Sequence, residues 1–108
     1  MSEKKVIMPE RQRKTPAGFG WVDHRLIRDS HVRRCTTDAL ALYLILITVA
    51  DRRGLSFYSD TLLCTMLGWS RERLDTARSD LERADLIIFS EPLYQVLSLP
   101  AKEDTKHD

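Results

Sequence analysis

The side chains that most often bind metal ions or attack substrates are few in this chain and widely spaced. His24, His31, Cys35 and Cys64 could be grouped into a zinc site, but they lack the close Cys-x-x-Cys pair typical of such sites. A cysteine nucleophile needs a cleft and a lowered thiol pKa, and the sequence indicates neither. The chain also lacks a glycine-rich loop that could hold phosphates. We therefore expect no enzyme activity, no cofactor and no metal.

Lysine and arginine are the remaining residues whose chemistry is informative, because they bind polyanions. The net charge of +1 conceals an asymmetry: residues 1–14 hold five bases and two acids, and residues 23–34 hold four and two. Residues 35–108 hold eight bases and twelve acids. A basic front is typical of an arm that meets a polyanion, and the alternative is a solvated leader. The bases of this front are Lys4, Lys5, Arg11, Arg13, Lys14, Arg25, Arg28, Arg33 and Arg34.

Composition predicts one folded domain between two polar ends. Residues 1–18 indicate a flexible basic arm, residues 19–100 a single domain, and residues 101–108 a disordered tail. The longest apolar run, residues 39–50, is too short to cross a bilayer, and residues 1–20 contain no secretory leader. With two isolated cysteines, these features predict a cytoplasmic protein with no membrane partner.

Periodicity and capping residues predict the elements of the domain. The order is helix, helix, short strand, helix, turn, helix and hairpin. The expected helices lie around 22–27 and at 37–53, 60–67 and 70–84, and the expected strands at 55–58, 86–89 and 94–99.

The helix expected at 37–53 is apolar on nearly every side. Thr37 or Asp38 can cap its start, and Gly54 can take the left-handed position after its end. A helix without a polar face must be surrounded by other elements. Since so short a chain offers few of them, part of this surface is expected to meet a second copy.

The stretch from 60 to 84 has the pattern of two helices that cross at a tight turn. Ser59 and Ser70 can cap the two helices, and Gly68 permits the turn between them. Four apolar residues of the second helix recur at helical spacing and predict the face that packs on the core. They are Leu74, Ala77, Leu81 and Ala84.

With the stretch "GFGWVDHRLIRD" and the region from "ALALYLILITVADRRG" to "SRERLDTARSDLERADLI", residues 19–99 resemble bacterial winged-helix DNA-binding proteins. The resemblance is to the type found in plasmid and phage replication initiators and in helix-turn-helix proteins of mobile elements. It implies a mainly α fold of three to four helices with a small β-hairpin, the wing having two or three strands. It also implies that helix 70–84 enters the major groove. The contacts carried over are Ser70, Arg71, Arg73, Thr76 and Ser79.

The charges on this helix depart from that family's pattern. Its bases and acids cancel, and the outermost positions are expected to be Glu72, Thr76, Ser79 and Arg83, with one base among four. The other arginines flank the apolar stripe, where they are expected to pair with Asp75 or Glu82. Because phosphate neutralisation dominates affinity for duplex DNA, the helix needs help from elsewhere. We expect it from Lys4, Lys5, Arg11, Arg13 and Lys14 in the arm and from Arg25 and Arg28.

The sequence therefore predicts a protein that binds double-stranded DNA as a homodimer, either a transcriptional regulator or an accessory factor of replication or of a mobile element. The alternative is a protein–protein interaction module of a replication or transposition complex with little DNA affinity. Leu62 and Met66 support the alternative, because they are expected on an exposed helical face. Phe57 and Tyr58 could stack on bases, but an aromatic pair before a helix cap more often belongs to the core, as we expect here.

Overall fold

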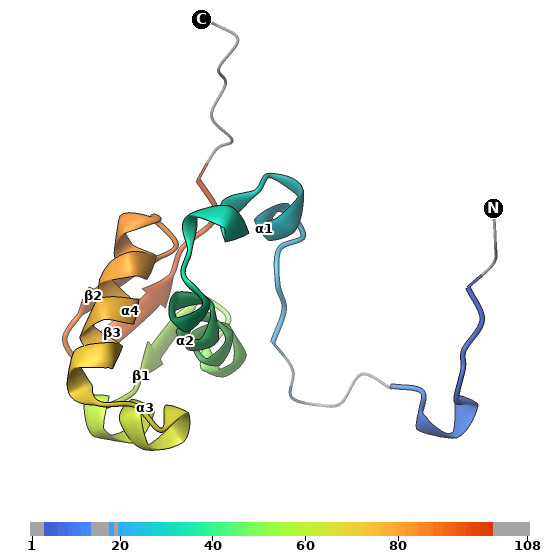
Figure 1. The fold of residues 1–108 in the computed structure, drawn as a ribbon, viewed down its shortest axis with the longest axis horizontal. Helices are drawn as coiled ribbons and strands as arrows, with labels where there is room; N and C mark the ends of the chain where they lie inside the picture. Colours follow the sequence, from blue (N-terminus) through green and yellow to red (C-terminus); the bar gives the residue numbers. More distant parts are fainter. Residues whose placement is uncertain (1–3, 14–17, 19, 101–108) are drawn as a thin grey trace, which may run out of the picture.

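The computed structural model of this chain describes residues 4–13, 18 and 20–100, shown in Figure 1. The tail predicted at 101–108 and Lys14 of the predicted arm lie outside these residues. The helices are α1 (Arg25–Arg28), α2 (Thr37–Val49), α3 (Asp60–Leu67) and α4 (Arg71–Arg83), with 3₁₀ turns at Pro9–Arg11 and His31–Arg34. The strands are β1 (Leu55–Phe57), β2 (Ile87–Ser90) and β3 (Leu93–Val96).

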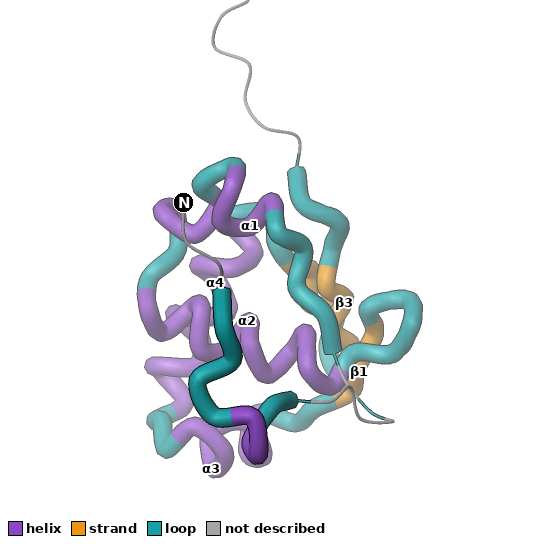
Figure 2. The backbone as a smooth tube through the Cα atoms, turned by 90° about the vertical axis from the view of Figure 1, so that its right-hand side faces the viewer, coloured by secondary structure: helices purple, strands orange, loops and turns teal. Residues whose placement is uncertain are grey.

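The three strands form one antiparallel sheet in the order β1-β3-β2. The hairpin predicted after α4 is therefore present, and the short strand before α3 joins its far edge by pairing with β3. The fold is mixed α and β, with four α-helices among the described residues, and this layout is compatible with a winged helix. Figure 2 shows the strands along one side of the molecule and the helices across the other.

The core lies where α2 and α4 pack on each other and on the inner face of the sheet. Within the described residues no helix is both long and apolar enough to cross a membrane. The largest side chains that are fully buried are Leu42 and Leu46 of α2, Leu63 of α3, Leu74 and Leu81 of α4, Leu86, and Tyr94 of β3.

The predicted N-terminal caps of α3 and α4, and the predicted turn between these helices, are confirmed. The Ser59 hydroxyl accepts a hydrogen bond from the Leu62 backbone N–H at 3.0 Å, and the Ser70 hydroxyl accepts one from the Arg73 N–H at 3.2 Å. Gly68 adopts the left-handed conformation, with φ of 71°, and so allows the chain to turn between the two helices.

For α2, the predicted capping residue and the predicted C-terminal end are both wrong. Thr36 is the cap, because its side chain accepts the Ala39 N–H at 3.1 Å. The helix ends at Val49, four residues before the predicted end, and Ala50 is extended. The Asp51 carboxylate accepts the backbone N–H groups of residues 53 and 55 and so builds a separate turn. Gly54 has positive φ as predicted, but it lies in this turn and not directly after the helix.

The expectation that Phe57 belongs to the core is also wrong, since 70% of this residue is exposed. Adjacent residues of a strand point to opposite faces, and in β1 the inner face is taken by Ser56. Tyr58 is half-buried against the core, as expected. The helix predicted around 22–27 is shorter than expected: only Leu26 of its apolar residues is buried, while Val22 and Ile27 are exposed.

Candidate nucleic-acid interface

The helix that would read bases, α4, has one buried and one exposed face, as predicted. Its apolar stripe is in the core: Leu74, Ala77 and Leu81 are fully buried and Ala84 nearly so. The four positions expected to be outermost are all exposed, namely Glu72, Thr76, Ser79 and Arg83. The helix can therefore pack on the protein with one face and present the other to a partner.

A shallow hollow of about 480 Å³ lies between α3 and the first turn of α4. Ser70 begins α4 beside it, and the Cys64 thiol contacts the Ser70 carbonyl oxygen at 3.7 Å. The small cysteine side chain thus lies where the two helices approach each other. The hollow is lined by Asp60, Thr61, Cys64, Thr65, Gly68, Trp69 and Arg71.

Two of the predicted DNA contacts, Arg71 and Arg73, form ion pairs within the protein. Arg71 lies 2.6 Å from the Asp60 carboxylate and 3.6 Å from that of Asp75. Arg73 donates two hydrogen bonds to Asp38 and lies over the Trp69 ring, 4.9 Å from its centroid. The hydrogen bond from Arg73 lowers the pKa of Asp38. Both arginine side chains remain more than half exposed, so these pairs face solvent.

Arg78 was expected at the edge of the stripe, in a pair with Asp75 or Glu82. It does pair with Asp75, at 2.8 Å, but it is also buried and donates to the Asp60 carboxylate at 2.8 Å and to the Tyr94 hydroxyl at 2.6 Å. Burial opposes its charge, but the hydrogen bonds to Asp60 and Tyr94 outweigh that effect and raise the pKa of Arg78.

Arg78 of α4 therefore contacts three other elements of the domain, α3, β2 and β3. Its guanidinium also lies 4.3 Å from the centroid of the Phe89 ring, in β2. Glu82, the other predicted partner, instead accepts the backbone N–H of Phe89 at 3.2 Å. Of these contacts, the sequence signals only the i, i+3 spacing of Asp75 and Arg78. The contacts with Asp60 and Tyr94 depend on how α3 and the hairpin pack, so Arg78 is positioned to hold α4 against the wing.

The arginines around α1 lie at the opposite end of α4 from its first turn. Arg34 donates to the carbonyl oxygen of Ala84, at the end of α4, at 3.3 Å, and to His31 Nδ1 at 2.8 Å. Arg25 pairs with Asp23 at 2.7 Å, and its hydrogen bonds lower the pKa of Asp23 to about 2. Arg28 forms no ion pair with another described residue. Figure 1 shows α1 away from the first turn of α4.

The described part of the arm is exposed throughout. Lys4, Lys5, Arg11 and Arg13 form no ion pairs with other described residues, and Pro9–Arg11 makes a single 3₁₀ turn. In Figure 1 this segment stands apart from the four α-helices. The arm bases are thus available for phosphate contacts, in contrast to those of α4.

Sequence reasoning missed Arg52 and Arg53 as candidate phosphate ligands, because it placed them at the end of α2. They lie in the exposed turn before β1 and form no ion pair with another described residue. The signal that could have found them is Asp51 followed three residues later by Gly54, a spacing typical of a turn.

A second exposed surface is apolar. Leu62 and Met66 are 45% and 47% exposed on the outer face of α3, as predicted. The outer face of the sheet is also apolar, because Leu55 and Ile88 flank Gln95 in one cross-strand row and Phe57 lies in the next.

No protein-family model, no curated protein and no solved structure matches this chain.

Proposed function

We propose that this protein is a winged-helix DNA-binding protein that inserts α4 into the major groove. The observation that carries the proposal is the arrangement of α3, the turn at Gly68, α4 and the β2–β3 hairpin, in which α4 buries its apolar stripe and exposes Thr76 and Ser79. An exposed helix of this kind, seated on a second helix, is the geometry that places side chains against base edges.

The ion pairs of Arg71 and Arg73 are compatible with this role. An exposed pair contributes about 0–1 kcal/mol, so either guanidinium can exchange its carboxylate for a phosphate at low cost. Glu72 and Asp75 oppose binding at the same place. The proposal therefore assigns α4 to base contacts and most of the phosphate neutralisation to other bases. These are Lys4, Lys5, Arg11, Arg13, Lys14, Arg25 and Arg28.

The first test measures binding of labelled duplex at two salt concentrations. Thr76→Glu combined with Ser79→Glu places two negative charges on the outer face of α4 without touching the core, and should weaken binding by roughly 100-fold. Gln95→Glu is the control, because it adds a negative charge to an exposed residue on the sheet instead. If wild type does not bind even at low salt, the proposal is wrong.

The second test addresses the predicted arginine contacts. Arg71→Ala and Arg73→Ala should each weaken binding by roughly 10-fold, whereas Arg83→Ala, at the other end of α4, should have a smaller effect. Circular dichroism of each variant shows whether the fold survives. If a folded variant carrying both Arg71→Ala and Arg73→Ala binds duplex as tightly as wild type, α4 is not the reading helix.

The role that this activity would serve is regulation of transcription or of the replication of a mobile element, with the protein acting as a homodimer. Two copies would double the number of phosphate contacts and place two α4 helices on one face. A duplex with two half-sites about one helical turn apart should then bind more tightly than one with a single half-site.

The second candidate function is that of a protein–protein interaction module, favoured by the exposure of Leu62 and Met66 on one helical face. In this case the domain would fold but bind duplex negligibly at low salt, and a protein of the same replication or transposition complex would occupy α3. Leu62→Glu should abolish that association while leaving the fold intact, which circular dichroism of the isolated domain checks. Sedimentation with the candidate partner distinguishes the two functions.

A further inference from the structure

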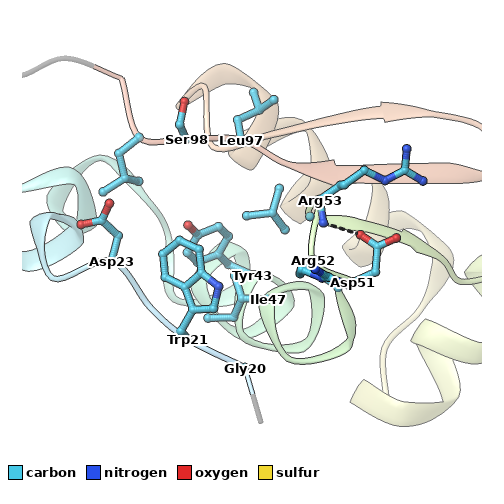
Figure 3. A pocket seen from close by; sticks show the side chains of 14 residues that line it. Gly20, Trp21, Asp23, Tyr43, Ile47, Asp51, Arg52, Arg53, Leu97 and Ser98 are labelled. Atoms are coloured by element: carbon cyan, nitrogen blue, oxygen red, sulfur yellow. Dashed lines mark hydrogen bonds between the residues drawn. The ribbon is translucent and has the colours of Figure 1, made fainter. Parts of the chain in front are cut away.

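A second hollow, more enclosed than the one beside α3, lies away from α4. It has a volume of about 460 Å³ and lies between the segment before α1, the second half of α2, the turn before β1 and the segment after β3. Trp21, Tyr43 and Ile47 form one wall, and Leu97 and Ser98 belong to the opposite one (Figure 3). We call this hollow the α2 pocket.

At one edge of the α2 pocket, the segment before α1 lies close against the backbone of α2. A Cβ added to Gly20 would lie 2.7 Å from the Ile47 carbonyl oxygen, so only glycine lets this segment lie directly on α2. Trp21 follows at once, and 73% of it remains exposed although it lines the pocket. An exposed tryptophan beside apolar walls is a surface that gains free energy when another apolar group covers it.

The same chain carries an exposed apolar segment that could cover it. Val6, Ile7 and Met8 are consecutive, and Ile7 is 96% exposed. Three adjacent large apolar residues in water are a liability unless they have a binding site. In Figure 1 this segment stands apart from the helices of its own chain.

The charges around the two surfaces are complementary. Lys4 and Lys5 precede the apolar segment and Glu10 follows it. Figure 3 shows Asp23 at one side of the pocket and, at the other, Arg52 and Arg53 with Asp51 beside them, which leaves that side one positive charge in excess. A segment that lies across the pocket can therefore place its lysines toward Asp23 and Glu10 toward the arginines. Asp23 already accepts from Arg25, but a carboxylate has lone pairs for further donors.

We infer that Val6–Met8 of one copy binds in the α2 pocket of a second copy, with Ile7 inserted against Trp21. Because each copy has both the segment and the pocket, the exchange is reciprocal and closes a twofold dimer. The twelve residue steps from Met8 to Gly20 span up to about 40 Å when extended, which is enough to reach a neighbouring protomer. This inference does not rest on DNA binding, and its test contains no DNA.

Sedimentation equilibrium measures the association directly. Wild type should have twice the 12.5 kDa mass of the chain, whereas Ile7→Asp and Trp21→Ser should each weaken dimerisation by roughly 100-fold, because each contact occurs twice in the dimer. Both residues are exposed in the single chain, so neither change removes a core contact. Leu44→Asp is the control, because it changes another exposed apolar residue, in α2 but outside the pocket.

Mixing the two weakened variants shows whether Val6–Met8 binds in the pocket of a second copy or in the pocket of its own chain. The Ile7→Asp chain retains a pocket and the Trp21→Ser chain retains a segment, so the mixture should form dimers more readily than either variant alone. Trp21 emission, measured in Trp69→Phe protein, should shift to shorter wavelength as wild type dimerises and should stay unshifted with Ile7→Asp.

Four results would overturn the inference. A monomeric wild type would exclude exchange, whether or not Ile7→Asp alters Trp21 emission. A dimer that survives both variants would place the interface elsewhere, and loss of the dimer in Leu44→Asp alone would place it on the exposed face of α2. A mixture that dimerises no better than its components would also exclude exchange.

Discussion

A single buried arginine links the two parts of the candidate DNA-binding unit. Arg78 lies in a helix that is polar on one side, where arginine would ordinarily be solvated. It is buried because Asp60, Asp75 and the Tyr94 hydroxyl accept its N–H groups. Without these acceptors its burial would cost several kcal/mol. The position of α4 relative to the wing therefore depends on one side chain and its three acceptors.

Removal of Arg78 should destabilise the whole domain. Arg78→Ala leaves the Asp60 carboxylate and the Tyr94 hydroxyl without their donor, and should lower the free energy of unfolding by about 3–5 kcal/mol. Arg83→Ala, whose pair with Asp80 is on the surface, should cost less than about 0.5 kcal/mol. Urea denaturation of both variants measures the difference, and similar values would show that the Arg78 cluster is energetically neutral.

The carboxylate of Asp51 should contribute to acid sensitivity. Hydrogen bonds from the backbone N–H of Leu55, and then of Arg53, hold the pKa of Asp51 below its usual value. A lowered folded-state pKa stabilises the fold above the unfolded pKa, and this contribution is lost as pH falls through the folded value. Asp51→Asn keeps an acceptor but does not titrate, so its Tm should fall less than that of wild type between about pH 5 and pH 2. If the Tm of Asp51→Asn and of wild type fell by the same amount over this pH range, the expectation would be wrong.

At the scale of elements, the turns at the two glycines with positive φ are constrained to different degrees. Gly68 separates α3 from α4 at φ of 71°, and a Cβ there would meet nothing within 4 Å. Gly54 has φ of 86°, and a Cβ there would lie 2.7 Å from the Val96 carbonyl oxygen. That oxygen is close because the turn packs against β3, whose Val96 N–H donates to the Gly54 carbonyl at 2.8 Å. One turn requires only a backbone conformation, and the other also requires space.

Alanine at each glycine should reveal this difference. Gly68→Ala places an alanine in the left-handed conformation without a steric overlap. It should therefore lower the free energy of unfolding by about 1–2 kcal/mol. Gly54→Ala adds a steric overlap with β3 and should cost more, on the order of 3 kcal/mol. Thermal unfolding of both variants measures the order of the two effects. If Gly68→Ala were the more damaging, the helix–helix turn would be the tighter of the two.

At the scale of the whole molecule, the basic charge that could neutralise phosphates is separated from the helix that would read bases. The arginines of α4 at 71, 73, 78 and 83 are all paired with carboxylates. The bases without such partners among the described residues lie in the arm and in the turns around α1 and before β1. Affinity for duplex and its sequence preference should therefore respond to different substitutions.

Neutralising the arm should change the salt dependence of binding but not the oligomeric state. Replacing Arg11, Arg13 and Lys14 by glutamine removes up to three phosphate contacts, which should reduce the salt slope by up to about 2.7. The variant keeps Lys4, Lys5 and Val6–Met8, so the dimer should persist. Titrations at several salt concentrations measure the slope, and an unchanged slope would show that the arm does not contact phosphate.

The sequence alone determined the features that depend on neighbouring residues. The caps at Ser59 and Ser70, the turn at Gly68 and the buried stripe of α4 follow from chemistry within one or two helical turns, and all are confirmed. Only the tertiary structure decided which face of β1 is buried, which acceptors surround Arg78, and that a pocket opens beside Gly20. These features depend on contacts between residues far apart in the chain, and local periodicity does not encode such contacts.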